Sequence, residues 1–289
     1  MILTLIVVAL APGAALFLFF YARDRYNREP LFPLIVTFLL GAASLLPAAA
    51  CSLGLERLTG WTSSTSRLLP LFLGALVVVG LVEEFWKFVV VRLYSYNRRE
   101  FDEPYDGIMY SVMASLGFAT GENLLYVVSG GVGTGILRAL LAVPGHAFYG
   151  VLMGYFLGSA KFAVNRRRAA GLQLAGLGLA VLAHGVYDFM VFALNERPLL
   201  LLMLPVFAVL SWVIFFRATR ERAQQSPYRH PRLAALHRTM AQEAAAQEGR
   251  SQKSAVRSEM AEVGEEEAET EDQMPETGNP DDSSPGGQR

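Results

Sequence analysis

The fold class is decided by residues 68–91, which read LLPLFLGALVVVGLVEEFWKFVVV. No charged side chain interrupts this run before Glu83, and the run is long enough to cross the roughly 30 Å hydrocarbon core of a bilayer as one helix. Its apolar residues are contiguous and do not follow the one-sided stripe of a soluble amphipathic helix. The stretch therefore predicts a membrane-spanning helix with charged residues towards its end.

Runs of the same kind lie on both sides of this one. Hydrophobic residues make up 53% of the chain and are gathered in long runs that short charged loops separate. Because a spanning helix needs about 20 apolar residues, we predict an all-α fold, a polytopic transmembrane helical bundle with seven spans. The predicted spans are residues 2–20, 31–53, 68–91, 107–128, 136–159, 172–194 and 199–216.

The basic residues of the loops predict the orientation. Arginine and lysine gather in loops 21–30, 92–105 and 160–171 and again after residue 216, whereas the intervening loops are poor in them. Positive loops favour the cytoplasm, so every loop fits an N-terminus outside the cell and a C-terminus inside it. We therefore predict a multi-pass protein of the cytoplasmic membrane, surrounded by the lipid bilayer.

The residues after the last span differ in composition. Residues 217–289 are polar, and their final part is acidic and rich in Pro, Gly and Ser. We predict a membrane domain over residues 1–216 and a largely disordered cytoplasmic tail over residues 217–289. The formal net charge of -1 gives no indication of nucleic-acid binding, and the single cysteine, Cys51, excludes a disulfide within the chain.

Charged residues inside the predicted spans carry the functional signal. A charge near the bilayer centre costs at least about 2.5 kcal/mol on insertion scales, so such a residue needs a partner or a function. In span 68–91, Lys87 follows Glu84 by three positions and Glu83 by four. The lysine can therefore pair with one carboxylate and leave the other free for chemistry. The alternative is a structural salt bridge near the cytoplasmic edge.

Three later spans carry further polar side chains. They are Glu122 and Asn123 in span 107–128, His146 in span 136–159, and His184 with Asp188 in span 172–194. The last two are four residues apart, so they share a helix face and the aspartate can orient the imidazole. At about 1.5 Å of rise per residue these groups reach similar depths, and we predict that they converge.

This set of side chains indicates a hydrolytic site. Two histidines and a carboxylate are the minimal protein ligands of a catalytic zinc ion, and a second glutamate can act as general base. A zinc ion held in this way activates water and polarises a peptide carbonyl. Taken alone, Glu122 and Asn123 fit interhelical hydrogen bonding equally well.

Four short motifs resemble those of a known family. They are Glu83-Glu84-x-x-Lys87, Phe118-x-x-x-Glu122-Asn123, the His146 helix with its following glycine, and His184-x-x-x-Asp188. Together they resemble the PrsW-type intramembrane metalloproteases, a group that is similar to the type II CAAX prenyl endopeptidases. The resemblance covers roughly residues 21–216 and not the tail. Each motif alone is weak, but four in order on four successive spans are specific.

The resemblance implies the roles of these residues. Glu83 and Glu84 would be catalytic, one of them as general base. We predict Zn2+ as the cofactor, with His146, His184 and Glu122 as metal ligands and Lys87, Asn123 and Asp188 as supporting residues. The CAAX enzymes carry histidine where this chain has Glu122, which favours the PrsW group and leaves the role of Glu122 open. Catalysis by glutamate-activated water without a metal also stays open.

The substrate implied by the resemblance is a membrane-anchored protein, for example an anti-sigma-type regulator. Two other functions compete with an intramembrane endopeptidase. One is a non-catalytic membrane scaffold of the same fold, which has no need for a second buried glutamate. The other is a proton-coupled transporter or channel, whose relay would spread its groups across the bilayer and extend through Arg138 and Tyr126.

Overall fold

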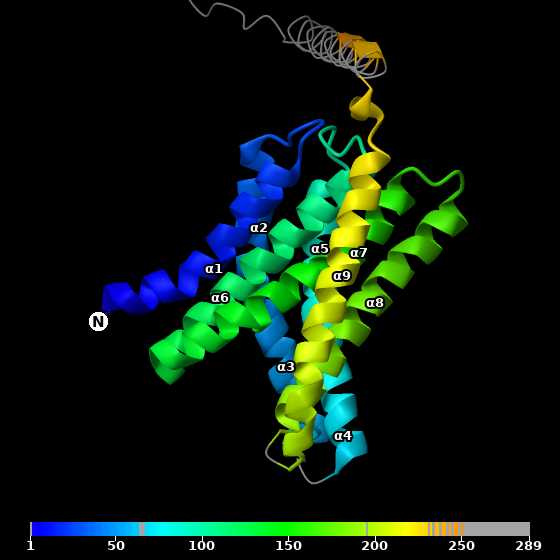
Figure 1. Cartoon of the computed structure of the whole chain (residues 1–289). Helices are drawn as coiled ribbons and strands as arrows, with labels where there is room; N and C mark the ends of the chain where they lie inside the picture. The colour runs from blue at the N-terminus through cyan, green and yellow to red at the C-terminus, as the bar shows by residue number, and fades with distance from the viewer. Residues whose placement is uncertain are drawn as a thin grey trace, which may run out of the picture. The chain divides into compact units, whose positions relative to one another are not determined.

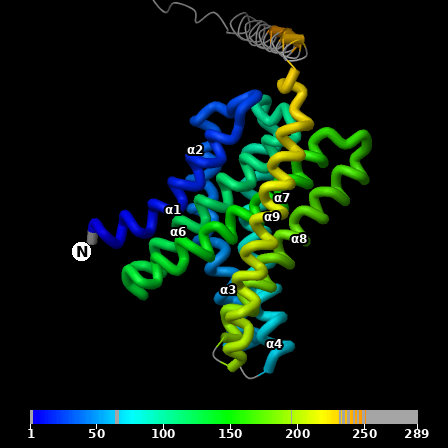
Figure 2. The backbone as a smooth tube through the Cα atoms, viewed as in Figure 1, coloured from blue at the N-terminus to red at the C-terminus, as the bar shows by residue number. Residues whose placement is uncertain are grey.

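The computed structural model describes residues 2–63, 67–194 and 196–230, together with isolated positions between 232 and 250. The chain divides into two compact units, Met1–His230 and Pro231–Arg289. Residues 217–230 of the predicted tail belong to the first unit, and residues 217–224 form the end of a helix. Most of the second unit, and with it the rest of the predicted tail, lies outside the described residues. The first unit is built of helices, and no strand occurs among its described residues (Figures 1 and 2).

Nine α-helices follow one another in the described part of the chain. Helices α4 and α5 are joined by the π-helical segment Gly74–Leu81, and a second such segment, Val91–Ser95, follows α5. The helices are α1 (Ile2–Arg23), α2 (Leu31–Ala43), α3 (Leu45–Thr59), α4 (Leu68–Leu73), α5 (Val82–Val90), α6 (Pro104–Leu140), α7 (Ala142–Lys161), α8 (Arg166–Phe192) and α9 (Met203–Gln224).

Six helical segments of the described chain are long and apolar enough to cross a membrane. One of them, Pro104–Lys161, contains both the fourth and the fifth predicted span. Gly131 interrupts it with a φ of 76°, and residues 132–140, the last part of α6, return alongside the earlier part of the same helix (Figure 1). A side chain at Gly135 would accordingly meet Val127. The prediction of a helical membrane bundle is confirmed. The described residues contain six such segments where seven spans were predicted, because the fourth and fifth predicted spans lie in one segment that reverses at Gly131.

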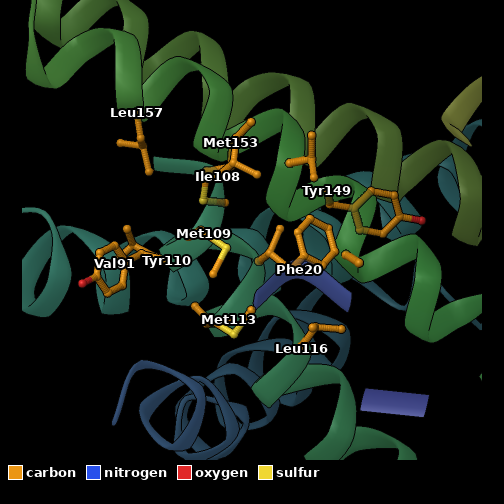
Figure 3. Close-up of a cluster of buried hydrophobic side chains, with 14 of the residues drawn as sticks. Phe20, Val91, Ile108, Met109, Tyr110, Met113, Leu116, Tyr149, Met153 and Leu157 are labelled. Atoms are coloured by element: carbon orange, nitrogen blue, oxygen red, sulfur yellow. The ribbon is translucent and has the colours of Figure 1, made fainter. Parts of the chain in front are cut away.

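Helices α6 and α7 form the centre of the bundle because glycine lets their backbones touch. A Cβ atom on Gly107 would lie 2.4 Å from the carbonyl oxygen of Gly154, and a Cβ atom on Gly158 would lie 2.1 Å from that of Pro104. Small residues four apart are the usual solution for close helix contacts in membranes. Methionine and aromatic side chains fill the remaining space, and Figure 3 shows Met113 of α6 and Met153 of α7 among them.

Four buried acidic residues join the loop between α1 and α2 to the start of α6. We call Asp24, Glu29, Glu103 and Asp106 the loop carboxyl cluster. Asp24 accepts a hydrogen bond from the backbone N–H of Glu29 at 2.9 Å, and Glu29 accepts one from the Tyr110 hydroxyl. Burial raises the pKa of Glu29 to about 8, that of Glu103 to about 7 and that of Asp24 to about 6.

We expect stability to fall as pH rises from about 4.5 to about 8. Across this range the folded protein binds more protons at the cluster than the unfolded chain does, so raising pH favours unfolding. The melting temperature of the detergent-purified protein should therefore be several degrees lower at pH 8 than at pH 6. Glu29→Gln should flatten this slope, and the control Glu100→Gln, which lies outside the cluster in a partly exposed ion pair with Arg98, should not. A melting temperature that rises with pH would contradict the prediction.

Candidate active site

The two adjacent glutamates of α5 have different surroundings. Glu84 is fully buried and accepts a hydrogen bond from Lys87 Nζ at 2.7 Å, and Lys87 is itself fully buried. Glu83 keeps 13% of its side chain exposed and lies 3.5 Å from the same ammonium group. Among the described residues, hydrogen bonds and ion pairs reach Glu83 only at Oε2. Lys87 thus neutralises Glu84 first and leaves Glu83 less engaged.

Helix α8 brings His184 against both glutamates. Its Nδ1 atom lies 2.9 Å from Glu84 Oε1, and its Nε2 atom lies 3.3 Å from Asp188 Oδ2 and 3.9 Å from Glu83 Oε2. The approach depends on Gly185, where a Cβ atom would lie 2.8 Å from the Cα atom of Leu76. A larger residue at this crossing would push α8 and its histidine away from α5.

Helix α7 supplies the second histidine. The Nδ1 atom of His146 lies 2.8 Å from Lys87 Nζ, and its Nε2 atom lies 3.1 Å from Glu122 Oε2. Because a lysine ammonium can only donate, Nδ1 is the acceptor and Nε2 the donor in this arrangement. The rings of His146 and His184 lie 5.0 Å apart, edge to face. The predicted convergence of α5, α6, α7 and α8 is therefore present in the structure.

Two further residues of this region were not predicted as site residues. Arg138 donates to Glu122 Oε2 at 2.7 Å and to Asn123 Oδ1 at 3.2 Å. Tyr149 stacks on the ring of His184 at 4.7 Å, and its buried hydroxyl has no hydrogen-bond partner in the described part of the chain. Asn123 also donates to the backbone carbonyl of Ala9, which ties the site to α1.

A cavity of about 650 Å³ opens beside these groups. Glu83 lines it, whereas Glu84 and Lys87 lie behind the wall. Apolar side chains of α3, α6, α7 and α8 form most of the remaining surface. The polar side chains of the lining include Glu83, Glu122, Arg138, His146, His184 and Asp188. Because they contact one another in one group, the arrangement resembles a catalytic site more than a relay across the bilayer.

The donor atoms of this group fit a metal ion. One donor atom each of Glu83, His146 and His184 lie within 4.8 Å of one another, and imidazole and carboxylate are ordinary zinc ligands. His146 would exchange one of its two present contacts for the ion. The buried Oε2 atom of Glu84 also has no hydrogen-bond partner among the described residues. The compact set includes Glu83, whereas Glu122 was predicted as the third ligand; Glu122 contacts Arg138 and His146 instead.

Comparison with known proteins gives one consistent result. A family model described as PrsW family intramembrane metalloprotease matches residues 29–217, which include every residue of this site. Protease PrsW of Geobacillus kaustophilus is 44% identical over 194 residues, which is 67% of this chain and 82% of the relative. Protease PrsW of Bacillus subtilis is 36% identical over 219 residues, 76% of this chain and 96% of the relative. No solved structure matches the chain significantly.

Proposed function

Because the chain belongs to the PrsW family of intramembrane metalloproteases, we propose that Glu83, His146 and His184 carry out its peptide-bond hydrolysis. The chain is a membrane protease with several membrane-spanning helices. The observation that carries the residue assignment is the convergence of these three donor groups, from α5, α7 and α8, beside one cavity. Buried ionisable groups of a membrane protein cluster in this way where they have a function.

The two glutamates have separate roles in this proposal. Glu83 faces the cavity, and its two oxygens have different roles: Oε2 would hold a metal, while Oε1, which makes no hydrogen bond or ion pair among the described residues, receives the proton of the attacking water and passes it to the leaving amine. Glu84 is a positioning residue, because it accepts from Lys87 and contacts Nδ1 of His184 without reaching the cavity. Asp188 holds the other side of the His184 ring.

We propose zinc as the metal and Glu83, His146 and His184 as its ligands. When bound, zinc would activate water and polarise the scissile carbonyl. Zinc ligation requires an ionised Glu83 and neutral histidines, and in that state the carboxylates of Glu83, Glu84, Glu122 and Asp188 exceed the cations Lys87 and Arg138 by two charges. With neutral histidines, one divalent cation makes the site neutral, as a low-dielectric environment favours.

The substrate in this proposal is a single-span, membrane-anchored protein that enters sideways from the bilayer. An apolar groove between α1, α7 and α9 shares the wall residues Leu141, Tyr187 and Leu204 with the catalytic cavity. The space in this groove is small, about 40 Å³, so it would take an apolar side chain of the substrate helix and not the helix itself. Anti-sigma-type regulators are the class that the motif resemblance implies.

The proposed orientation gives the side from which water arrives. With the basic loops in the cytoplasm, the loop at residues 193–197 lies outside. The lining of the cavity includes Leu194 of that loop and Leu201 shortly after it. We therefore propose that the enzyme cuts its substrate in the outer half of the membrane.

Mapping new protein termini tests this function. The purified protein and a Glu83→Gln variant are each incubated in detergent with membrane proteins of the same cells, and new N-termini are labelled and sequenced. We expect termini that depend on Glu83, within single-span proteins and near the outer end of the span. Cuts that appear equally with the variant, or none at all, would overturn the proposal.

A further inference from the structure

Arg138 lies at the catalytic cavity although it is distant from the other site residues in sequence. The chain reverses at Gly131, whose φ of 76° suits glycine and strains other residues. This reversal carries Arg138 back along α6 until it faces Glu122 and Asn123 of the same helix. The guanidinium lines the cavity with 15% of its side chain exposed.

The guanidinium is held on three sides. It donates to Glu122 Oε2 at 2.7 Å and to Asn123 Oδ1 at 3.2 Å, and it lies 4.1 Å from the ring centroid of Tyr126. A charge-assisted hydrogen bond of this length in a partly buried place is among the stronger polar contacts. The cation–π contact adds to the preference for arginine over a shorter side chain. Arg138 is therefore well fixed.

We infer that Arg138 is a positioning residue that holds the Glu122 carboxylate against Nε2 of His146. The same Glu122 oxygen accepts from Arg138 and lies 3.1 Å from His146 Nε2, while Lys87 holds Nδ1 on the other side of the ring. Without Arg138, Glu122 would be a mostly buried charge without its cation and would leave this position. A bound metal would take the place of Lys87 at Nδ1 of His146, so the Glu122 contact at Nε2 is the one that orients the ring. This inference rests on the proposed catalytic role of His146.

A double-mutant cycle tests the inference. The assay measures cleavage of a single-span reporter that carries a cut site found by the terminus mapping. We expect Arg138→Gln to lower kcat about 10- to 100-fold with KM changed less than about threefold, because the binding surface stays intact. Arg138→Lys should recover most of the loss. In a Glu122→Gln background, Arg138→Gln should add almost nothing, since both act through one contact.

Histidine NMR tests the same inference without activity. In protein labelled with 15N at histidine, Arg138→Gln and Glu122→Gln should shift the ring nitrogens of His146 and leave those of His184 in place. The control Arg197→Gln changes an exposed arginine that contacts a backbone carbonyl, and it should change neither histidine. Three results would each overturn the role of Arg138. They are effects of Arg138→Gln and Glu122→Gln on kcat that multiply in the double variant, no recovery of kcat by Arg138→Lys, and ring signals of His146 that do not shift. A wild type that cleaves nothing would overturn the proposed function instead, and the NMR result would still decide on Arg138.

Discussion

Glu83→Gln should lower kcat by about a thousandfold or more while the protein stays folded. General base catalysis contributes about 10²- to 10⁴-fold, and the glutamine amide can neither accept the proton of water nor bind a metal as a carboxylate does. Glu83 lies at the cavity, 3.5 Å from Lys87 and 3.9 Å from His184, and both of these groups have a closer partner in Glu84, so the loss of Glu83 leaves no buried charge without a partner. The melting temperature should therefore change by no more than a few degrees.

Glu84→Gln is the matched comparison at the neighbouring position. It removes the 2.7 Å partner of a fully buried lysine, and breaking a buried ion pair typically costs about 3–5 kcal/mol. We expect this variant to lose both activity and thermal stability. Reporter cleavage and thermal unfolding, measured on the same samples, separate the two glutamates. Activity in Glu83→Gln that is close to wild type, or a stable and active Glu84→Gln, would reverse their assignment.

The fold class could be predicted from the sequence because the bilayer imposes one simple rule. A helix must be apolar for about 20 residues to cross it, and the sequence contains several uninterrupted apolar runs of this length. The details could not be predicted in the same way. The reversal at Gly131 and the π-helical segment Gly74–Leu81 leave hydropathy unchanged, because both keep apolar side chains facing lipid or the core.

Most of the candidate site could also be predicted, since a charge inside a span is costly and therefore conspicuous. The sequence predicted that the charged groups of the spans reach similar depths and converge, and the structure brings together Glu83, Glu84, Lys87, His146 and His184. Arg138 was not predicted as a site residue, because it stands near the start of the predicted span 136–159 and resembles an ordinary charge at the outer edge of the membrane. Only the return of the chain after Gly131 brings it to Glu122. An arginine shortly after a glycine-rich stretch between two spans is the signal that was available.

The loop carboxyl cluster could not be predicted from the sequence at all. Asp24, Glu29 and Glu103 stand in short polar loops, where acidic residues are normally solvated, so the sequence gives no reason to expect burial. Their burial comes from packing of the α1–α2 loop onto the start of α6, where Tyr110 donates to Glu29, and from Ser226, which donates to Glu103. Long-range contacts of this kind have no local pattern.

The metal content of the purified protein should distinguish zinc-dependent hydrolysis from activation of water by glutamate without a metal. Purified without chelators, the protein should carry about one zinc per chain, because three donor groups of the right type meet within 4.8 Å. His146→Ala and His184→Ala should each lose most of the zinc and nearly all activity, whereas His230→Ala, an exposed histidine after α9, should keep both. Glu122→Gln should also keep the zinc, since Glu83 is the proposed third ligand.

Chelation then tests whether the metal is needed. We expect a chelator to abolish cleavage by the wild type and added Zn2+ to restore it, with elemental analysis following the same samples. Full activity in protein with less than about 0.1 metal per chain would exclude the zinc mechanism. Glu83 would then have to activate water without the help of a metal, with His146 and His184 as hydrogen-bond donors to the developing oxyanion. In that case the Lys87 ammonium, which already contacts Glu83, Glu84 and His146, would be the cation that makes their proximity possible.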